Sequence, residues 1–270
     1  MPSRRSAVLA AIVTVLLASP LGALARAAEI PLPAPADSGR GLARATPASV
    51  AFFQRSDLAF GLGTAAAVIV TAHHDAWLRR EAIESDTRLD RNLAHDVRPL
   101  GNSALVLPAL LAGWGVARAF HADGPASGFT EVGLSVAAAG AGALVVKEVL
   151  GRARPDDSPG DSRSFQPFSG RSSFPSGHAT VAFALAESVR LSSGRSWTPW
   201  LTYPAAAFVG WSRVRDDVHW TSDVVAGAAL GIWTARKVHR VLPAERRRFS
   251  RLGLAPCTPD GTPGVCLTLR

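Results

Sequence analysis

The sequence predicts an all-α protein built as a bundle of six core helices. Its 270 residues are 47% hydrophobic and only 19% charged, a composition that fits one sizeable domain. Apolar residues recur in near-continuous runs of helix length, divided by polar stretches that contain glycine and proline. No Val/Ile-rich strand run followed by a glycine-rich loop is present in the sequence, which argues against a parallel sheet.

The N-terminal residues have the three parts of a secretory signal. Arg4 and Arg5 precede an uncharged run from Ser6 to Ala25, and small residues follow through Ala28. This order of basic, apolar and small residues is typical of export signals. We therefore predict that residues 1–27 are a cleaved signal peptide or, if retained, an N-terminal anchor.

A Pro- and Ala-rich segment at 28–55 leads into the helical domain, which we place at 56–243. The segment is predicted to be a flexible linker or an extended arm that packs on the domain. Each apolar run of the domain is interpreted as the core of one helix. The six runs are 58–72, 99–117, 132–146, 179–186, 196–212 and 224–235.

The last residues, 244–270, form a predicted tail with a short hairpin. Cys257 and Cys266 flank a turn-rich Thr-Pro-Asp-Gly-Thr-Pro-Gly segment. In an oxidising compartment a disulfide across this hairpin is one expectation, and two unpaired thiols are the alternative.

Phosphate-binding side chains recur in the second half of the chain. Lys147, Arg154 and Arg213 can hold the non-bridging oxygens of a phosphoryl group, since each arginine offers a bidentate fork. Ser176 and Gly177 precede the 179–186 run, so the Ser176 hydroxyl and the free N–H groups of a helix start can also point at an anion.

Two histidines complete this set. His219 and Asp223 are four residues apart, which on a helix places them on one face, where the carboxylate can accept the Nδ1–H of the imidazole. An imidazole oriented in this way is a competent nucleophile toward phosphorus, and His178 can protonate the departing oxygen.

These clusters resemble the three-part signature of the type-2 phosphatidic acid phosphatases, which share an active site with bacterial class A acid phosphatases and vanadium haloperoxidases. The parts are Lys147 separated by six residues from Arg154-Pro155, then Pro175 to His178, then Ser212-Arg213 with His219 and Asp223. The resemblance covers roughly residues 100 to 240 and has no gap in the motifs. It implies a helical phosphatase of this family, embedded in a membrane.

The resemblance assigns a role to each residue. Lys147, Arg154 and Arg213 bind phosphate with help from Ser176 and Gly177, and His178 is the general acid. His219 forms a phosphohistidine that Asp223 orients. No metal and no cofactor are implied, because the cationic side chains do what metal ions do in other phosphatases.

The implied reaction is hydrolysis of a phosphate monoester or of a terminal phosphate, with a lipid phosphate as the expected substrate. A soluble periplasmic acid phosphatase acting on small esters is the alternative. A vanadium haloperoxidase and a non-catalytic lipid-phosphate binder are weaker ones. The formal charge of +8 comes from scattered arginines without interleaved aromatic residues, so no nucleic-acid partner is expected.

The location follows from the same observations. The expected place is the inner membrane of a bacterial envelope, with the site facing the periplasm and 58–72 outside the bilayer. The shortness of several runs supports the alternative of a soluble periplasmic bundle.

Several other polar residues are not assigned to the chemistry. His73 and His74 lack further ligands at metal-binding spacing and are expected to be polar surface. The aspartates after Arg154 are expected to solvate their loop, and Trp220 to pack in the wall of the site; these aspartates are Asp156, Asp157 and Asp161.

Overall fold

A computed structural model describes residues 53–84, 88–249, 252–257 and 264–269. The prediction of an all-α bundle is confirmed, and four of the six apolar runs lie entirely within one helix. The run 99–117 is divided between two helices at Asn102, and the run 196–212 begins two residues before its helix. The described helices are α3 (Arg55–Glu84), α4 (Arg88–Val97), the 3-10 helix η1 (Arg98–Gly101), α5 (Ser103–Ala119), α6 (Asp123–Leu150), α7 (Gly177–Ser193), α8 (Thr198–Arg215) and α9 (Thr221–Phe249).

Helix α4 was not predicted. Its apolar residues, Leu89, Leu93 and Val97, stand singly among charged and polar ones instead of forming a continuous run. They recur every four residues, which is the spacing of an amphipathic helix.

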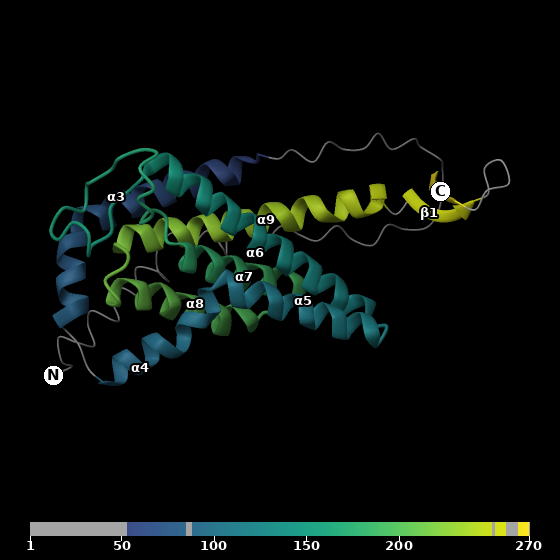
Figure 1. Ribbon diagram of the computed structural model, residues 1–270, viewed down its shortest axis with the longest axis horizontal. Helices are drawn as coiled ribbons and strands as arrows, with labels where there is room; N and C mark the ends of the chain where they lie inside the picture. The colour runs from purple at the N-terminus through teal and green to yellow at the C-terminus, as the bar shows by residue number, and fades with distance from the viewer. Residues whose placement is uncertain (1–52, 85–87, 250–251, 258–263, 270) are drawn as a thin grey trace.

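Helix α7 is the centre of the bundle. It contacts α6, α8, α9 and η1, and nine of its residues are buried. One hydrophobic cluster joins α7 to α3, α8 and α9, and a second joins it to α5 and α6. The helices lie lengthwise beside one another, and the long loop from Gly151 to Ser176 covers one end (Figure 1).

Two glycines of α9 bring it into backbone contact with α7. A Cβ on Gly227 would lie 2.5 Å from the Ser176 carbonyl oxygen, and one on Gly231 would lie 2.3 Å from that of Thr180. Any side chain at these positions would push the helices apart. At this contact the Ser176 N–H donates to the Asp223 carbonyl oxygen at 2.9 Å, so two predicted site segments are joined directly.

Gly151 lets the long loop fold back on the end of α6. It has φ of 55°, in the left-handed region, and its N–H donates to the Lys147 carbonyl oxygen at 2.8 Å. A Cβ at this position would lie 1.8 Å from the Gln166 carbonyl oxygen. Gly151 therefore ends α6 and starts the loop within one residue.

Helices α3 and α6 are long and apolar enough to cross a membrane. The segments Ala94–Gly101 and Ser103–Ala119 pass the same test as a pair bent by 63°. The fold is that of a membrane protein. The expectation that 58–72 lies outside the bilayer fails this test, because the run is part of a 30-residue helix.

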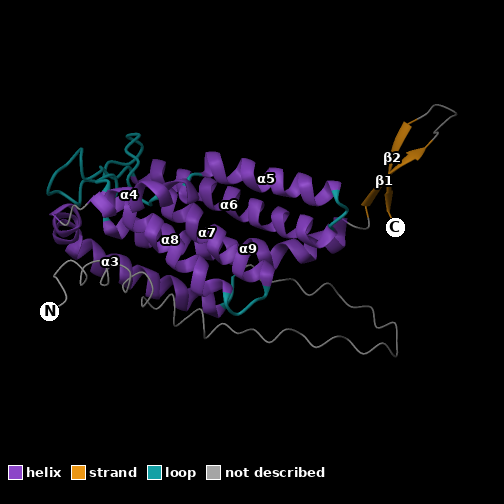
Figure 2. Cartoon of the chain, turned by 90° about the horizontal axis from the view of Figure 1, so that it is seen from below, coloured by secondary structure: helices purple, strands orange, loops and turns teal. Residues whose placement is uncertain are grey.

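The C-terminal hairpin agrees with the prediction. Strands β1 (Leu252–Cys257) and β2 (Gly264–Leu269) pair antiparallel near the end of α9 (Figure 2). The register sets Cys257 opposite Gly264 and Cys266 opposite Ala255. The disulfide stays a prediction, because the side chains of the hairpin lie outside the described part, as do residues 1–52 with the signal and most of the lead-in.

Candidate active site

The predicted site residues all come from the end of the bundle that the long loop covers. Lys147 is in the last turn of α6 and Arg213 is in the last turn of α8. The loop carries Arg154 and Ser176, and Gly177 and His178 begin α7. His219 precedes α9, and Asp223 is in the first turn of that helix.

Two of the cations meet at Ser172 of the loop. Lys147 Nζ donates to the Ser172 carbonyl oxygen, and Arg154 Nη2 donates to the Ser172 hydroxyl at 3.3 Å. A Cβ on Gly177 would lie 3.7 Å from Lys147 Cε, so this side chain reaches the start of α7. Neither cation has a carboxylate partner within the described ranges. Their positive charge is therefore available to an anion.

Ser176 is the N-cap of α7. It is fully buried, and its hydroxyl accepts from the Ala179 N–H at 3.5 Å. The first N–H groups of α7 thus begin beside Lys147, which is the arrangement that binds anions at a helix start.

His178 is surrounded by positive charge. Its partial burial, followed by the positive charges of Arg213, Arg98 and Lys147, lowers its pKa to about 4. Arg98 is an exposed residue of η1 that the sequence motifs did not identify. A Cβ on Gly101, at the end of η1, would lie 2.8 Å from the His178 carbonyl oxygen, so this short helix packs directly on the start of α7.

Arg213 is buried beside these groups. Its Nη2 pairs with Asp216, and its Nε donates to the Ser212 hydroxyl at 3.2 Å. Asp216 therefore fixes the direction of the guanidinium. Among the charged groups that lower the pKa of His178, Arg213 has the largest effect, which indicates that it faces the start of α7.

Asp223 is fully buried and its carboxylate is bonded on both oxygens. Oδ1 accepts from Arg152 Nη1 at 2.5 Å, and Oδ2 accepts from the Ser173 hydroxyl at 2.5 Å and from the Trp220 N–H at 2.9 Å. Burial by itself would raise the pKa of Asp223, but the nearby His219 and Arg152 outweigh it and hold the pKa below its usual value. Asp223 is therefore an anion in the resting site.

His219 lies close to Asp223 but is not on the same helix face. Helix α9 begins at Thr221, so His219 is in the preceding turn, and the prediction of one shared helical face was wrong. The shortest approach, Nδ1 to Asp223 Oδ2, is 3.6 Å, which is longer than a hydrogen bond. The reason is that Oδ2 already caps the start of α9 through the Trp220 N–H.

The buried His219 ring is also held in its neutral form. Within the described part of the chain its Nδ1 has no hydrogen-bond partner. Burial lowers the pKa of His219, and the neighbouring Asp223 only partly offsets this. A neutral imidazole 3.6 Å from a carboxylate can donate to it after a small movement of either side chain.

A buried ion network behind Asp223 was missed by the sequence analysis. Arg152 bonds Asp223, the Ser222 hydroxyl at 2.7 Å and Asp75 Oδ2 at 2.8 Å. Asp75, in the middle of α3, also accepts from the Ser222 N–H at 2.9 Å. Arg152 is two residues before Arg154, but no spacing in the sequence links it to a carboxylate 77 residues earlier.

A second ion pair fixes the turn that carries His219. Arg79 of α3 donates through Nε and Nη2 to both carboxylate oxygens of Asp217, each at 2.6 Å. Asp217 has φ of 58°. A short polar residue tolerates this left-handed conformation better than a bulky one does.

The residues set aside in the sequence lie largely as expected. His73 and His74 are exposed. Asp156, Asp157 and Asp161 are exposed in the loop. Trp220 is fully buried and its Nε1 donates to the Ala153 carbonyl oxygen at 3.1 Å, which confirms its packing role.

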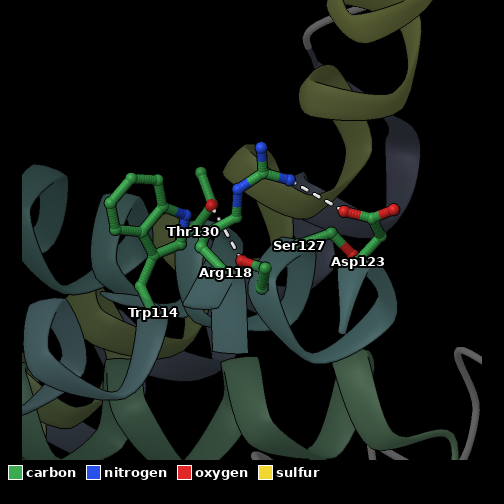
Figure 3. A pocket seen from close by; sticks show the side chains of 6 residues that line it. Trp114, Arg118, Asp123, Ser127 and Thr130 are labelled. Carbon is green, nitrogen blue, oxygen red and sulfur yellow. Dashed lines mark hydrogen bonds and ion pairs between the residues drawn. The ribbon is translucent and has the colours of Figure 1, made fainter. Parts of the chain in front are cut away.

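A shallow hollow at the other end of the bundle is separate from this site. It lies between the end of α5 and the start of α6, where Arg118 pairs with Asp123 at 2.7 Å (Figure 3). Trp114 and Thr130 also line it, and no predicted site residue does. The hollow therefore takes no part in the arrangement described above.

The family model that matches the chain is that of the PAP2 superfamily, over residues 128–247. These residues include every predicted site residue from Lys147 to Asp223. The part of the chain that carries these residues is thus similar to the PAP2 superfamily. A lipid A 1-phosphatase of Rhizobium johnstonii is 37% identical over 126 residues, 45% of this chain and 48% of the relative.

Two further proteins are similar to this chain. A lipid A 1-phosphatase of Porphyromonas gingivalis is 40% identical over 89 residues, which are 32% of this chain and 17% of the relative. The match thus spans about half of one curated relative and under a fifth of the other. A transmembrane PAP2-type phosphatidylglycerolphosphate phosphatase from Bacillus subtilis has a similar structure, with a TM-score of 0.53 and 25% identity over 75% of this chain and 98% of that one.

Proposed function

We propose that the protein is a metal-independent phosphatase that removes a phosphate monoester or a terminal phosphate from a membrane lipid. The observation that carries this proposal is the gathering of Lys147, Arg154 and Arg213 around two histidines at one end of a membrane-type bundle. Similarity to proteins named as lipid A 1-phosphatases supports the lipid substrate class.

In the proposed first step, His219 Nε2 attacks phosphorus in line with the leaving oxygen. The new P–N bond forms as the P–O bond to the lipid breaks, and the departing oxygen takes a proton from His178. Arg154, Arg213 and Lys147 stabilise the equatorial oxygens of the transition state, where the charge is spread most widely. Ser176 and the Gly177 N–H complete this cradle.

In the second step, water attacks the phosphohistidine and the P–N bond breaks. His178 now accepts the proton of the attacking water, so its role reverses from acid to base. Asp223 stabilises the positive charge that His219 carries as the bond forms and breaks, because it is an anion within 3.6 Å of Nδ1. Arg152 and Asp75 hold Asp223 in place from behind.

The low pKa of His178 bears on its role as the general acid. A value of about 4 leaves the ring neutral at pH 7 while the cation cluster holds no anion. A bound phosphate dianion adds negative charge beside the same ring, and this raises the pKa. The substrate therefore helps to load the proton that the leaving oxygen needs.

We further propose that the site faces the periplasmic side of the inner membrane. The sequence places Arg195, Lys237 and Arg246 toward the opposite end of the helices that carry the site, and positive residues favour the cytoplasmic side. A cysteine introduced at Asp157, in a variant without Cys257 and Cys266, should react with an impermeant maleimide in intact cells. One at Arg195 should react only after lysis, and the reverse pattern would contradict this orientation.

The activity is tested by measuring phosphate release from a diacylglycerol phosphate and from para-nitrophenyl phosphate, in detergent with EDTA present. The proposal predicts release from the lipid, unaffected by EDTA and inhibited by vanadate, which resembles the five-coordinate phosphorus. Release from the small ester alone would identify an acid phosphatase acting on small esters. Inhibition by EDTA that added metal reverses would contradict the mechanism.

A further inference from the structure

The loop between α6 and α7 carries two exposed phenylalanines that differ in their contacts. Phe165 forms a β-bridge with Arg152, and its ring lies 5.2 Å from that guanidinium and 6.5 Å from the ring of Phe174. Phe168 is 72% exposed, and no ring contact of its side chain occurs among the described residues. Packing explains Phe165 and leaves Phe168 unexplained.

The backbone of Phe168 is in an unfavourable conformation that its neighbours hold in place. Its φ is 57°, in the left-handed region that a bulky side chain rarely adopts. Its N–H donates to the Glu148 carbonyl oxygen at 2.9 Å, and the Gln166 N–H donates to that of Gly151 at 2.9 Å. The loop thus holds an apolar ring in the open at a position that would suit Asn or Gly better.

The position of Phe168 links it to the lipid-facing side of the bundle. Glu148, which anchors it, directly follows Lys147 in α6, one of the two helices long and apolar enough to cross a membrane. Leu144 and Val145 are exposed on α6 and lie four and three residues before Glu148, on the same face of the helix. The hydrogen bond to Glu148 therefore places the backbone of Phe168 at the end of this apolar face, beside the residue that follows Lys147.

Ser172 connects the ring to that site at short range. It is four residues after Phe168 in the same loop, and both Lys147 and Arg154 donate to it. The start of α9 beside these cations is buried, whereas residues 165–171 of the loop are exposed. The loop is therefore an open side of the site, and Phe168 lies on it.

We propose that Phe168 is a specificity-determining residue that contacts the acyl chains of the substrate lipid next to its headgroup. This proposal rests on the proposed function. The contact gives the lipid a binding advantage over small phosphate esters, which have no chain to reach the ring. Removal of the ring then weakens lipid turnover and leaves the chemistry at phosphorus unchanged.

The test compares wild type with Phe168→Asn, which suits the left-handed backbone and keeps the loop in place. The substrates are dioctanoylglycerol phosphate in detergent and para-nitrophenyl phosphate. We expect kcat/KM for the lipid to fall at least about fivefold, since loss of an apolar contact costs roughly that much or more. The value for the small ester should stay within about twofold, and the melting temperature should not fall.

Phe120→Asn is the matched control. Phe120 is 80% exposed and is the C-cap of α5, at the end of the bundle away from the site. This variant should change neither activity. Binding of the dioctanoyl lipid and of inorganic phosphate is measured in parallel by calorimetry, and Phe168→Asn should weaken only the lipid.

Three outcomes would overturn the proposal. An equal fall in kcat/KM for both substrates would mean that Phe168 supports the structure of the site. An unchanged kcat/KM for the lipid would mean that Phe168 does not contact the substrate. A fall in kcat/KM that is seen only when the lipid is in vesicles, and not in detergent, would mean that the ring contacts the bilayer and not the bound substrate. If the wild type hydrolyses neither substrate, the proposed function fails, and unchanged lipid binding by Phe168→Asn would then overturn this inference separately.

Discussion

Glu187 and Asp223 are both fully buried carboxylates, and they lie toward opposite ends of the bundle. Glu187 accepts from Arg190 at 2.7 and 2.9 Å, from Arg236 at 2.7 Å and from the Tyr203 hydroxyl at 2.5 Å. Every charge of this cluster has a partner. The cluster joins α7, α8 and α9 and has no open cationic group to offer a ligand.

The cluster around Asp223 is built differently. Arg152 is shared between Asp223 and Asp75, but Lys147 and Arg154 bond only a carbonyl and a hydroxyl of Ser172. His219 Nδ1 is buried without a hydrogen-bond partner in the described residues. One buried ion cluster is closed, which suits stability, and the other is open toward an anion, which suits catalysis.

The largest effect is expected for Asp223→Asn. The amide would keep the shape of the side chain but lose the negative charge near His219 Nδ1. By analogy with other histidine–carboxylate pairs, kcat should fall by about 10³-fold or more. Steady-state kinetics on the lipid phosphate measure this, and a kcat within threefold of wild type would show that another group orients His219.

Arg154→Lys is expected to have the next largest effect. Lysine retains the charge but loses the second donor of the guanidinium fork, so kcat/KM should fall by about 10- to 100-fold. Arg163→Lys is the control, because Arg163 is exposed in the same loop and is not part of the proposed phosphate cradle. Equal losses in the two variants would argue against a specific role for Arg154.

The pKa of His178 should respond to an anion. Without a ligand it is about 4, because burial and the surrounding cations disfavour the charged ring. Saturating inorganic phosphate adds negative charge, so the pKa should rise by at least about one unit. An NMR titration of the histidine ring signals, assigned with His178→Asn, gives both values, and an unchanged pKa would mean that phosphate binds elsewhere.

Glu187→Gln should have the smallest effect on activity and a clear effect on stability. It leaves Arg190 and Arg236 beside a neutral amide, and we expect a loss of about 1–3 kcal/mol, since both guanidinium groups remain partly exposed to water. Thermal unfolding in detergent measures this. Kinetic constants per folded molecule should stay within twofold of wild type, and a tenfold fall in kcat would show that the closed cluster also serves the site.

The sequence predicted those features that depend on residues close together in the chain. The helical class followed from apolar runs, and Lys147, His178 and His219 were found because their neighbours form compact local motifs. These motifs lie at helix ends, where residues close in the sequence remain close in space.

The features that the sequence did not predict depend on contacts between distant segments of the chain. Asp75 stands alone in a long helix, and its partner Arg152 lies 77 residues away, so no local pattern predicts the pair. The shared helical face of His219 and Asp223 was wrong because α9 begins two residues after His219, and where a helix starts is set by its cap. Likewise, the contact of η1 with His178, which brings Arg98 near, follows from tertiary packing at Gly101.

The most direct test of the account is to trap the phosphoenzyme in wild type and in His219→Ala, using ³²P-labelled diacylglycerol phosphate, EDTA and rapid quenching in base. The account predicts an acid-labile, base-stable phosphoenzyme in wild type that is absent in the variant, together with loss of hydrolysis in a variant that still folds. A folded His219→Ala protein that retains more than a few per cent of the activity, or that still forms the phosphoenzyme, would contradict the assignment of His219 as the nucleophile.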